Sequence, residues 1–440
     1  MMREAEMTRE QATHCSACSS PGPRITRRVF VKASGIALVG LGLDPIFLTR
    51  AAYAVKRSPS ARGKTLVCIF QRGAVDGLNM IVPHGEEIYY RERPRIAVPR
   101  PGKPGGAIDL DGHFGMHPAL EPLEPYYRNG TLAVVHAVGS PDPTRSHFEA
   151  QDYMETGTPG IKSTGDGWLN RYLAHAREHR DTPFRGVAIG RELPRALRGA
   201  APALALENLE TFGVRAPDRA RDRLTRAFEE LYSASSTGLV ATSSAEALEA
   251  IKMLREIDPE RYRPAAGAEY PASPLGRSLR QIAQLIKADL GVEVAFADVG
   301  GWDTHVNQGG SEGQLAARLR DFAQSLAAFA RDLGERLADV VVLTMSEFGR
   351  TVAENGNLGT DHGRATAMLV LGGATRGGRV LGRWPTLDPA RRFEGRDLAV
   401  TTDFRDLFGE VLVKHLGPAD LSAIFPGFDA APERWPGVFG

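Results

Sequence analysis

The strongest constraint on the fold is a series of short apolar runs bounded by glycine and polar residues. The first spans residues 65–70, and four others follow at residues 132–138, 292–299, 340–345 and 367–371. Runs of this length without polar alternation are typical of strands buried on both faces, as in a parallel sheet. We therefore expect these five segments to form the central sheet of an α/β protein.

Amphipathic helices alternate with these strands. One is expected to begin after Ser273 as N-cap, with Pro274 in its first turn, and to bury a stripe within residues 275–286. A second apolar stripe, at spacings of four and three, runs through residues 315–333. The repeated order of strand and helix predicts a three-layer α/β sandwich with a mainly parallel sheet.

The same patterns predict how the chain is divided. We expect residues 65–440 to form a single α/β domain, because the apolar runs extend over most of this length. Residues 190–270 contain no strong strand pattern. This stretch is therefore predicted to be a mostly helical insertion or cap.

The first 54 residues have the features of an export signal. Residues 24–32 read Arg-Ile-Thr-Arg-Arg-Val-Phe-Val-Lys, which is similar to the bacterial twin-arginine signature. The apolar run of residues 33–48 is too short and interrupted to span a membrane, and Ala52-Tyr53-Ala54 offers a small-x-small cleavage site. We expect the twin-arginine translocation machinery as a partner, cleavage after Ala54, and a periplasmic or secreted product. The alternative is an amphipathic arm with a chance arginine pair.

Charge and cysteine content narrow the remaining possibilities. Residues 55–64 are predicted to be a flexible join behind the leader, and cleavage would discard Cys15 and Cys18 and leave Cys68 alone. No intrachain disulfide is then expected. The 54 basic and 53 acidic residues give a net charge of +1. We expect neither a nucleic-acid partner nor a stable membrane anchor after cleavage.

Unusual polar residues gather where the predicted strands end. Ligands of open parallel sheets bind beyond the carboxyl ends of the strands, so these side chains are candidates for one site. Carboxylates and imidazoles are ligands for divalent metals, and arginines bind anionic groups. The sequence therefore predicts a divalent metal ion, of unknown identity, at this edge. The residues are Asp76, Arg145, Ser146, His147, Asp303, His305, Glu347, Arg350, Asp361 and His362.

Each of these residues also has a structural interpretation. Ser146 with Glu149 three residues later matches a capping box, so Ser146 has a second interpretation as a helix start. Glu347 has an ion pair with Arg350 as its alternative. The remaining segments are compatible with turns that satisfy their own backbone: Asp76-Gly77, Asp303-Thr304-His305 and Asp361-His362-Gly363.

The motifs in these loops resemble those of the DUF1501 family of exported bacterial proteins, in the alkaline phosphatase/sulfatase-like superfamily. The resemblance covers nearly all of the expected mature chain. It rests on residues 71–79, 117–120, 145–152, 301–305, 346–351 and 359–365. It implies an alkaline phosphatase-like sandwich.

The resemblance also implies roles for individual residues. Asp76 is similar in position to the first metal-binding Asp of the superfamily, Asp303 and His305 to the middle pair, and His362 to the final His. Two positions depart from the superfamily pattern. Phe348 follows Glu347 where a ligand His is usual, which favours one metal or none, and Pro141 stands where a sulfatase carries its nucleophile.

Two functions of different class are compatible with these residues. The first is an exported metal-dependent hydrolase of phosphate or sulfate esters, acting on an anionic small molecule or polysaccharide ester. The second is a catalytically silent relative that serves as a secreted binding or assembly protein. For the enzyme, the expected catalytic residues are Ser146, Arg145 and His147. The expected metal ligands are Asp76, Asp303, His305, Glu347, Asp361 and His362.

Overall fold

The computed structural model describes residues 63–176, 182–209, 249–254, 256–257 and 259–440. The predicted leader, most of the predicted join, and the centre of the predicted insertion at residues 190–270 lie outside these ranges. Among the described residues, no helix is both long and apolar enough to span a membrane.

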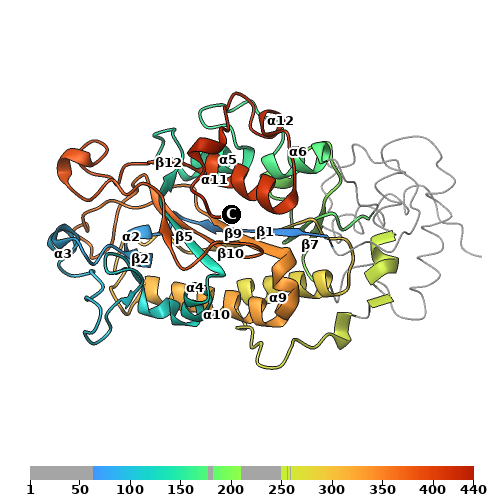
Figure 1. The fold of residues 1–440 in the computed structure, drawn as a ribbon, viewed down its shortest axis with the longest axis horizontal. Helices are drawn as coiled ribbons and strands as arrows, with labels where there is room; N and C mark the ends of the chain where they lie inside the picture. Colours follow the sequence, from blue (N-terminus) through green and yellow to red (C-terminus); the bar gives the residue numbers. More distant parts are fainter. Residues whose placement is uncertain (1–62, 177–181, 210–248, 255, 258) are drawn as a thin grey trace, which may run out of the picture.

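A mixed sheet with mainly parallel strands forms the centre of the described structure (Figure 1). Its strand order is β11-β5-β10-β9-β1-β8-β6-β7, with β12 paired to β5. All five predicted strands are present. The strands are β1 (Thr65–Arg72), β5 (Leu132–Gly139), β6 (Gly186–Ile189), β7 (Leu204–Leu206), β8 (Val294–Gly300), β9 (Val340–Met345), β10 (Thr366–Gly372), β11 (Val380–Leu381) and β12 (Thr402–Asp403).

Helices cover both faces of this sheet, which gives the predicted three-layer sandwich (Figure 1). One face is covered by α4 (Glu124–Arg128), α9 (Pro274–Lys287) and α10 (Gln314–Leu333). The other is covered by α5 (His147–Thr156), α6 (Trp168–His175), α11 (Phe404–Val411) and α12 (Leu421–Ile424). The shorter elements are α2 (Gly77–Met80), α3 (Glu87–Glu92) and a small sheet of β2 (Ile81–Val82), β3 (Ile108–Asp109) and β4 (Gly115–Met116).

Strand β1 shows how the apolar runs produce two cores. Side chains alternate across a strand, so Val67 and Ile69 pack into the core beneath α9 and α10, while Leu66, Cys68 and Phe70 face the core beneath α6 and α11. All five are completely buried. Burial also raises the pKa of the Cys68 thiol well above its usual range.

The predicted helix starts and stripes agree with the structure. The Ser273 hydroxyl accepts a hydrogen bond from the Gly276 amide at 3.0 Å and caps α9. The apolar stripe of α10 is buried from Leu315 to Leu333.

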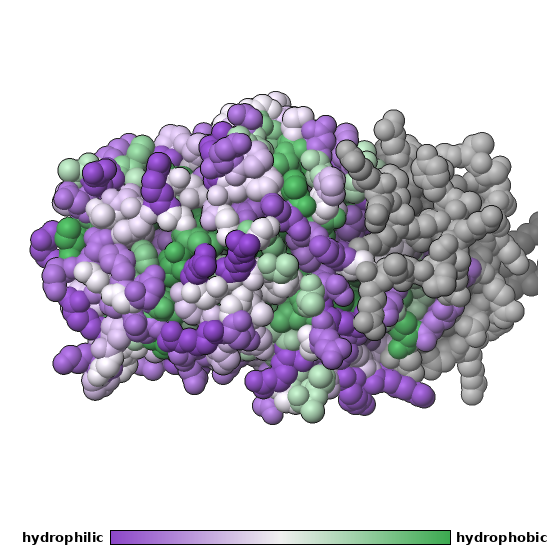
Figure 2. Space-filling model, viewed as in Figure 1, coloured by the Kyte–Doolittle hydropathy of each residue, from purple (hydrophilic) through white to green (hydrophobic). Residues whose placement is uncertain are grey.

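The face in Figure 2 is covered mostly by hydrophilic residues, with hydrophobic residues in small separate groups.

The direction of β10 is the feature that positions the site. β10 pairs antiparallel with both β9 and β5, whereas β9 and β8 lie parallel to β1. The beginning of β10 therefore lies at the same sheet edge as the carboxyl ends of β1, β8 and β9. This explains how a loop that precedes β10 joins loops that follow the other strands.

Two further strands, β6 and β7, extend the sheet beyond β8 in parallel register. The sequence pattern did not predict them, because runs of four and three residues are too short to separate from loops. β7 lies within the segment predicted to lack strong strands.

Candidate metal centre

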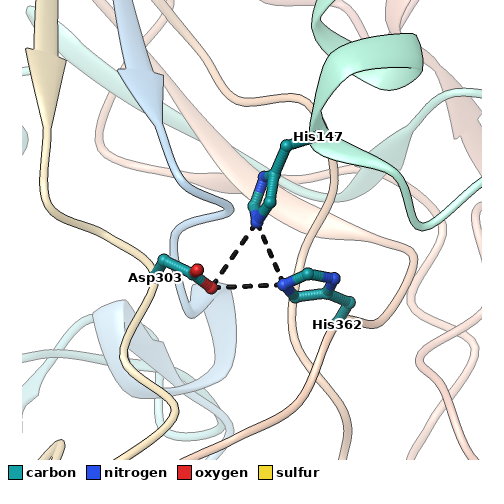
Figure 3. Close-up of side chains that lie close together, drawn as sticks. All are labelled: His147, Asp303 and His362. Carbon is teal, nitrogen blue, oxygen red and sulfur yellow. Dashed lines mark hydrogen bonds and ion pairs between the residues drawn. The ribbon is translucent and has the colours of Figure 1, made fainter.

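Three side chains from three separate loops meet at this edge of the sheet. His147 is the first residue of α5, Asp303 follows β8, and His362 precedes β10. The His147 and His362 Nε2 atoms lie 3.0 Å apart, and Asp303 Oδ1 lies 3.2 Å from His362 Nε2 and 3.5 Å from His147 Nε2 (Figure 3). These atoms form a compact triangle of potential ligands.

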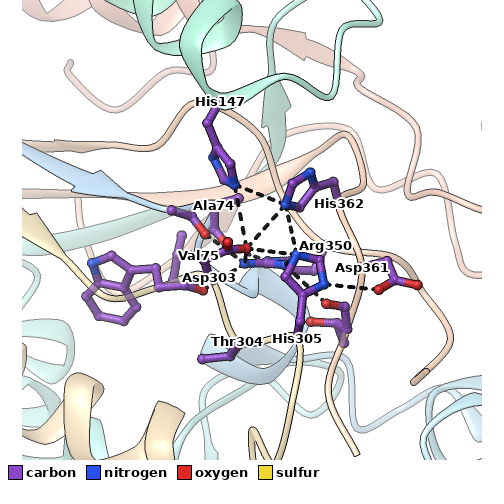
Figure 4. A network of polar contacts seen from close by, with 12 residues as sticks. Ala74, Val75, His147, Asp303, Thr304, His305, Arg350, Asp361 and His362 are labelled. Carbon is purple, nitrogen blue, oxygen red and sulfur yellow. Dashed lines mark hydrogen bonds and ion pairs between the residues drawn. The ribbon is translucent and has the colours of Figure 1, made fainter. Parts of the chain in front are cut away.

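A third histidine joins this triangle from the loop after β8. His305 Nε2 lies 3.0 Å from His362 Nε2 and 3.0 Å from Asp303 Oδ1 (Figure 4). We refer to His147, Asp303, His305 and His362 together as the His–Asp cluster. Their side chains are between 23% and 45% exposed, so a small molecule can reach the cluster from solvent.

The hydrogen-bond partner of the Nδ1 atom in each ring determines which ring nitrogen carries the proton and which carries the free lone pair. The Nδ1 atom of His147 lies 2.7 Å from Glu347 Oε1, that of His362 lies 2.9 Å from the Arg145 carbonyl, and that of His305 lies 3.0 Å from Asp361 Oδ1. All three partners are acceptors, which assigns the ring proton to Nδ1. The Nε2 lone pair of His362 therefore faces Asp303 Oδ1 and the Nε2 atoms of both other histidines.

This arrangement fits a divalent metal ion. Ligand atoms about 2.0–2.1 Å from a tetrahedral ion lie about 3.3 Å from each other, and the triangle has sides of 3.0 to 3.5 Å. Ligand histidines also typically donate their second nitrogen to a carboxylate or carbonyl, as these three do. The donor set of imidazole and one carboxylate therefore fits the group that the sequence predicts.

Arg350 fixes the loops around the cluster. Its guanidinium is 1% exposed and donates to the carbonyl oxygens of Ala74 at 2.8 Å, Gly73 at 2.8 Å, Trp302 at 3.0 Å and Thr360 at 3.1 Å. It also donates to Asp303 Oδ1 at 2.5 Å. Because these donors are used inside the protein, Arg350 holds the loops together and places a fixed positive charge beside Asp303.

The pKa values in the cluster follow from these contacts. Burial raises the pKa of Asp303, but the hydrogen bond and charge of Arg350 and the neighbouring histidines outweigh it and hold this pKa below its usual range. The hydrogen bond to Glu347 raises the pKa of His147 despite its partial burial. Burial, together with the charges of His147 and Arg350, lowers the pKa of His362. The two facing histidines therefore differ in how readily they take up a proton.

The model of a family described as a protein of unknown function, DUF1501, matches residues 131–408. The chain belongs to the DUF1501 family. No curated protein matched the sequence.

Solved structures similar to this DUF1501 chain are distant. The C-terminal periplasmic domain of EcEptC from Escherichia coli, in complex with Zn, has a TM-score of 0.34 at 11% identity, covering 72% of this chain and 75% of that one. The PsFucS1 sulfatase from Pseudoalteromonas sp. has a TM-score of 0.35 at 12% identity, covering 93% and 77%. The phosphonate monoester hydrolase of Agrobacterium radiobacter has a TM-score of 0.29 at 12% identity, covering 84% and 79%.

Two predicted metal ligands of the DUF1501 chain lie behind the histidines rather than among them. Glu347 is fully buried, and its Oε1 accepts hydrogen bonds from the Gly73 amide at 2.8 Å and from Gln151 at 2.9 Å, in addition to the His147 contact. Burial raises the pKa of Glu347, but these hydrogen bonds outweigh it and lower the pKa overall. Asp361 accepts hydrogen bonds from His305 and, at 3.0 Å, from the Asn355 amide.

The structure does not bring Asp76 into the described cluster. Its carboxylate is completely buried and accepts hydrogen bonds from Arg93 Nη1 at 2.6 Å, from Gln308 Nε2 at 2.6 Å and from the Leu78 amide at 3.2 Å. Both oxygens of Asp76 already have donors as partners. The residue anchors the loop after β1, and we do not carry its predicted metal role forward.

The predicted catalytic residues take three different positions. The Arg145 guanidinium pairs with Asp397 at 2.6 Å and Glu394 at 2.7 Å, so its charge is already neutralised, and its carbonyl orients His362. Ser146 is the N-cap residue of α5, but its hydroxyl makes no capping bond, and the capping box is therefore wrong. His147, predicted as catalytic, lies in the triangle of potential metal ligands.

Phe348 explains one departure from the superfamily pattern. Its ring is buried and packs against His147 with centroids 4.9 Å apart and against His362 with centroids 5.1 Å apart. The side chain that cannot bind a metal therefore supports two that can. The roles of Phe348 and of Gln151, which binds Glu347, were missed because only their three-dimensional contacts reveal them.

Proposed function

We propose that this DUF1501 chain is an exported, metal-dependent hydrolase of phosphate or sulfate esters that uses a single divalent ion. The observation that carries the proposal is the convergence of three imidazole lone pairs and one carboxylate oxygen within the His–Asp cluster. Arg350 already donates to Asp303 Oδ1 and lies 3.4 Å from His305 Nε2. The Nε2 atoms of His147 and His362, in contrast, face each other 3.0 Å apart, and two such acceptors repel one another unless a cation lies between them. The residues proposed to hold the ion are His147, Asp303, His305 and His362.

The donor set favours a particular class of ion. Imidazole nitrogens suit zinc and neighbouring transition metals, whereas calcium and magnesium prefer sites built from oxygen. The guanidinium of Arg350 donates to the same Oδ1 atom of Asp303 and lies 3.4 Å from His305 Nε2, so one fixed positive charge already stands at the cluster (Figure 4). These contacts support one transition-metal ion rather than a pair of ions.

The start of α5 supports an anionic substrate group. A bound divalent ion would polarise a phosphoryl or sulfuryl oxygen as a Lewis acid. α5 begins at His147, and the amides of a helix N-terminus bind anions. The Ser146 hydroxyl, which makes no capping bond, is our candidate nucleophile.

The buried carboxylate of Glu347 and the carbonyl of Arg145 orient the rings that would bind the ion. Each fixes one histidine in the tautomer that leaves Nε2 free. Asp361 does the same for His305 from an exposed position. We assign the two carboxylates to this orienting role, in place of the direct ligation predicted from the sequence.

Elemental analysis combined with an ester panel tests the proposal. The chain should be purified after export, and we expect cleavage after Ala54, about one transition-metal ion per chain, and turnover of aryl phosphates or sulfates. His362→Ala should lose both the metal and the turnover. His84→Asn is the matched control, because it removes a histidine that pairs with Asp109 away from the cluster.

The outcomes separate the two functions predicted from the sequence. Protein that contains no metal and hydrolyses no ester of the panel would refute the hydrolase proposal. Protein that binds the ion through His362 but turns over no ester would favour the catalytically silent binding protein. A cytoplasmic, uncleaved product would refute the export assignment without affecting the metal centre.

A further inference from the structure

Large hydrophobic side chains are rarely exposed in the described part of this protein. Those that are strongly exposed are Phe148 at 91%, Val306 at 51% and Ile161 at 46%. A single exposed hydrophobic residue needs no explanation, but a group of them around a polar site marks a binding surface. Their location is therefore informative.

Two of these side chains directly follow members of the His–Asp cluster. Phe148 follows His147 in the first turn of α5, and Val306 follows His305 in the loop after β8. Consecutive Cα atoms are about 3.8 Å apart, so both apolar residues stand beside the candidate metal ligands. Figure 4 shows that His147 and His305 enter the cluster from different elements on different sides.

Ile161 is connected to the same turn of α5. Lys162, the next residue, forms an ion pair with Glu149, which follows Phe148. Glu149 also accepts a hydrogen bond from Thr144 at 2.7 Å, in the loop that leads into α5. The loop that carries Ile161 is therefore held near the helix start that carries His147 and Phe148.

The exposure of Phe148 has no structural purpose within the described residues. A side chain that is 91% exposed contributes almost no burial to the folded state. In contrast, Phe348 fills the space behind the same histidines and is 3% exposed. The cluster therefore has an apolar support behind two of its histidines, and the residues that follow His147 and His305 in the chain expose apolar side chains, which we call the apolar rim.

We propose that the ligand of this metal centre carries an apolar group, an alkyl chain or an aromatic ring, next to the group that meets the metal. Phe148 and Val306 are the specificity-determining residues, and they contact the apolar part. This inference rests on the proposed function and names its substrate class, an amphipathic ester. A fully polar sugar ester would leave both side chains in water.

Binding of two hydroxamic acids tests this inference without requiring ester turnover. Hydroxamates chelate transition metals, so acetohydroxamate reports the metal centre alone, whereas octanohydroxamate adds an apolar chain. Calorimetry on the zinc-loaded, full-length mature protein should give an affinity about tenfold or more higher for the octanoyl compound, because the chain buries apolar surface against the rim.

Matched variants assign the effect to the rim. Phe148→Ser combined with Val306→Ser should reduce the affinity ratio to about twofold or less, while acetohydroxamate affinity and zinc content stay unchanged. Phe148→Leu should retain most of the ratio because it keeps an apolar side chain. Both positions are exposed, so the melting temperature should not change.

Three outcomes would overturn the inference. They are equal affinity for the two hydroxamates in the wild type, an affinity ratio that survives the double substitution, and no binding of either compound to zinc-loaded protein. Failure of ester turnover in the separate panel would remove the hydrolase assignment, whereas a chain-length effect that depends on Phe148 would still establish the apolar rim.

Discussion

Two aspartates at the same edge of the sheet have opposite surroundings. Asp76, after β1, receives hydrogen bonds from Arg93, Gln308 and a backbone amide, so its oxygens are surrounded by donors. Asp303, after β8, has Arg350 on one side, but its Oδ1 also faces the unprotonated nitrogens of His305 and His362. Donors complete a structural network, whereas facing acceptors leave a place for a cation.

The residues that hydrogen-bond to Asp76 have further partners inside the protein. Arg93 is 0% exposed and also donates to Asn79 at 2.7 Å, to Val352 and to Thr351, while Tyr89 donates to Asn79 at 2.7 Å. The residues at the His–Asp cluster, in contrast, are partly open to solvent. Residue type and sheet position alone therefore do not distinguish a ligand from an anchor.

The largest effect is expected when Asp76 is replaced. Asp76→Ala leaves the buried Arg93 without its carboxylate, and the loss of one partner from a buried ion pair costs about 3–5 kcal/mol. Denaturant unfolding should show this fall in the free energy of unfolding, with unchanged metal stoichiometry in the protein that remains folded. Loss of the metal without loss of stability would reverse the assignment of Asp76.

Replacement of Asp303 should reduce metal affinity strongly and stability less. Asp303→Ala removes one oxygen ligand from a set dominated by imidazoles, and we expect the affinity for zinc to fall by about a hundredfold or more, equivalent to about 2.7 kcal/mol. Competition with a chromophoric chelator measures this change. The stability of the metal-free protein should change less than in Asp76→Ala, because the Asp303 side chain is 45% exposed and solvent screens its pair with Arg350, whereas Asp76 is completely buried.

A smaller effect on metal affinity is expected when Glu347, which lies behind the cluster, is replaced. Glu347→Gln keeps the size of the side chain but removes the charge that orients the His147 ring, and such partners typically contribute tenfold to hundredfold to metal affinity. Gln151→Leu provides a comparison, because Gln151 also contacts Glu347 but no histidine. If Glu347→Gln abolished binding as completely as Asp303→Ala, direct ligation by Glu347 would be restored as the better assignment.

Sequence reasoning found the sheet and most of the cluster for a clear physical reason. Buried strands require continuous apolar runs, and residues placed directly after such runs lie at one edge, as Asp303 and His305 do. His362 lies in a loop that precedes a strand, and it reaches this edge only because β10 is antiparallel to its neighbours, a direction that the sequence pattern does not reveal. These features depend on local order along the chain.

The roles of the remaining residues depend on contacts between distant segments. Glu347 is two hundred positions from His147, and nothing in either segment shows that one orients the other. Asp76 reads as a ligand from its position after β1, while its partner Gln308 lies 232 residues away. The sequence alone does not distinguish a carboxylate that binds a metal directly from one that hydrogen-bonds to a metal-binding histidine.

The smallest effect is expected from a change in pH, which acts in opposite directions on the stability of the metal-free protein and on metal binding. The hydrogen bond to Glu347 raises the pKa of His147 above its usual 6.5, so in metal-free protein this pair stabilises the fold below pH 6.5 and loses its contribution as pH rises through the raised pKa. Metal binding requires the unprotonated ring and has the opposite dependence.

Zinc affinity should therefore fall about tenfold per pH unit below the raised pKa of His147, with an onset above pH 6.5. The slope should steepen further at lower pH, because burial and the charges of His147 and Arg350 lower the pKa of His362. Chelator competition between pH 5 and 8 measures both slopes. Glu347→Gln should move the onset to lower pH, since the neutral amide no longer favours the protonated ring. An onset that does not move would show that Glu347 does not set the protonation of His147, and the orienting role proposed for this carboxylate would be lost.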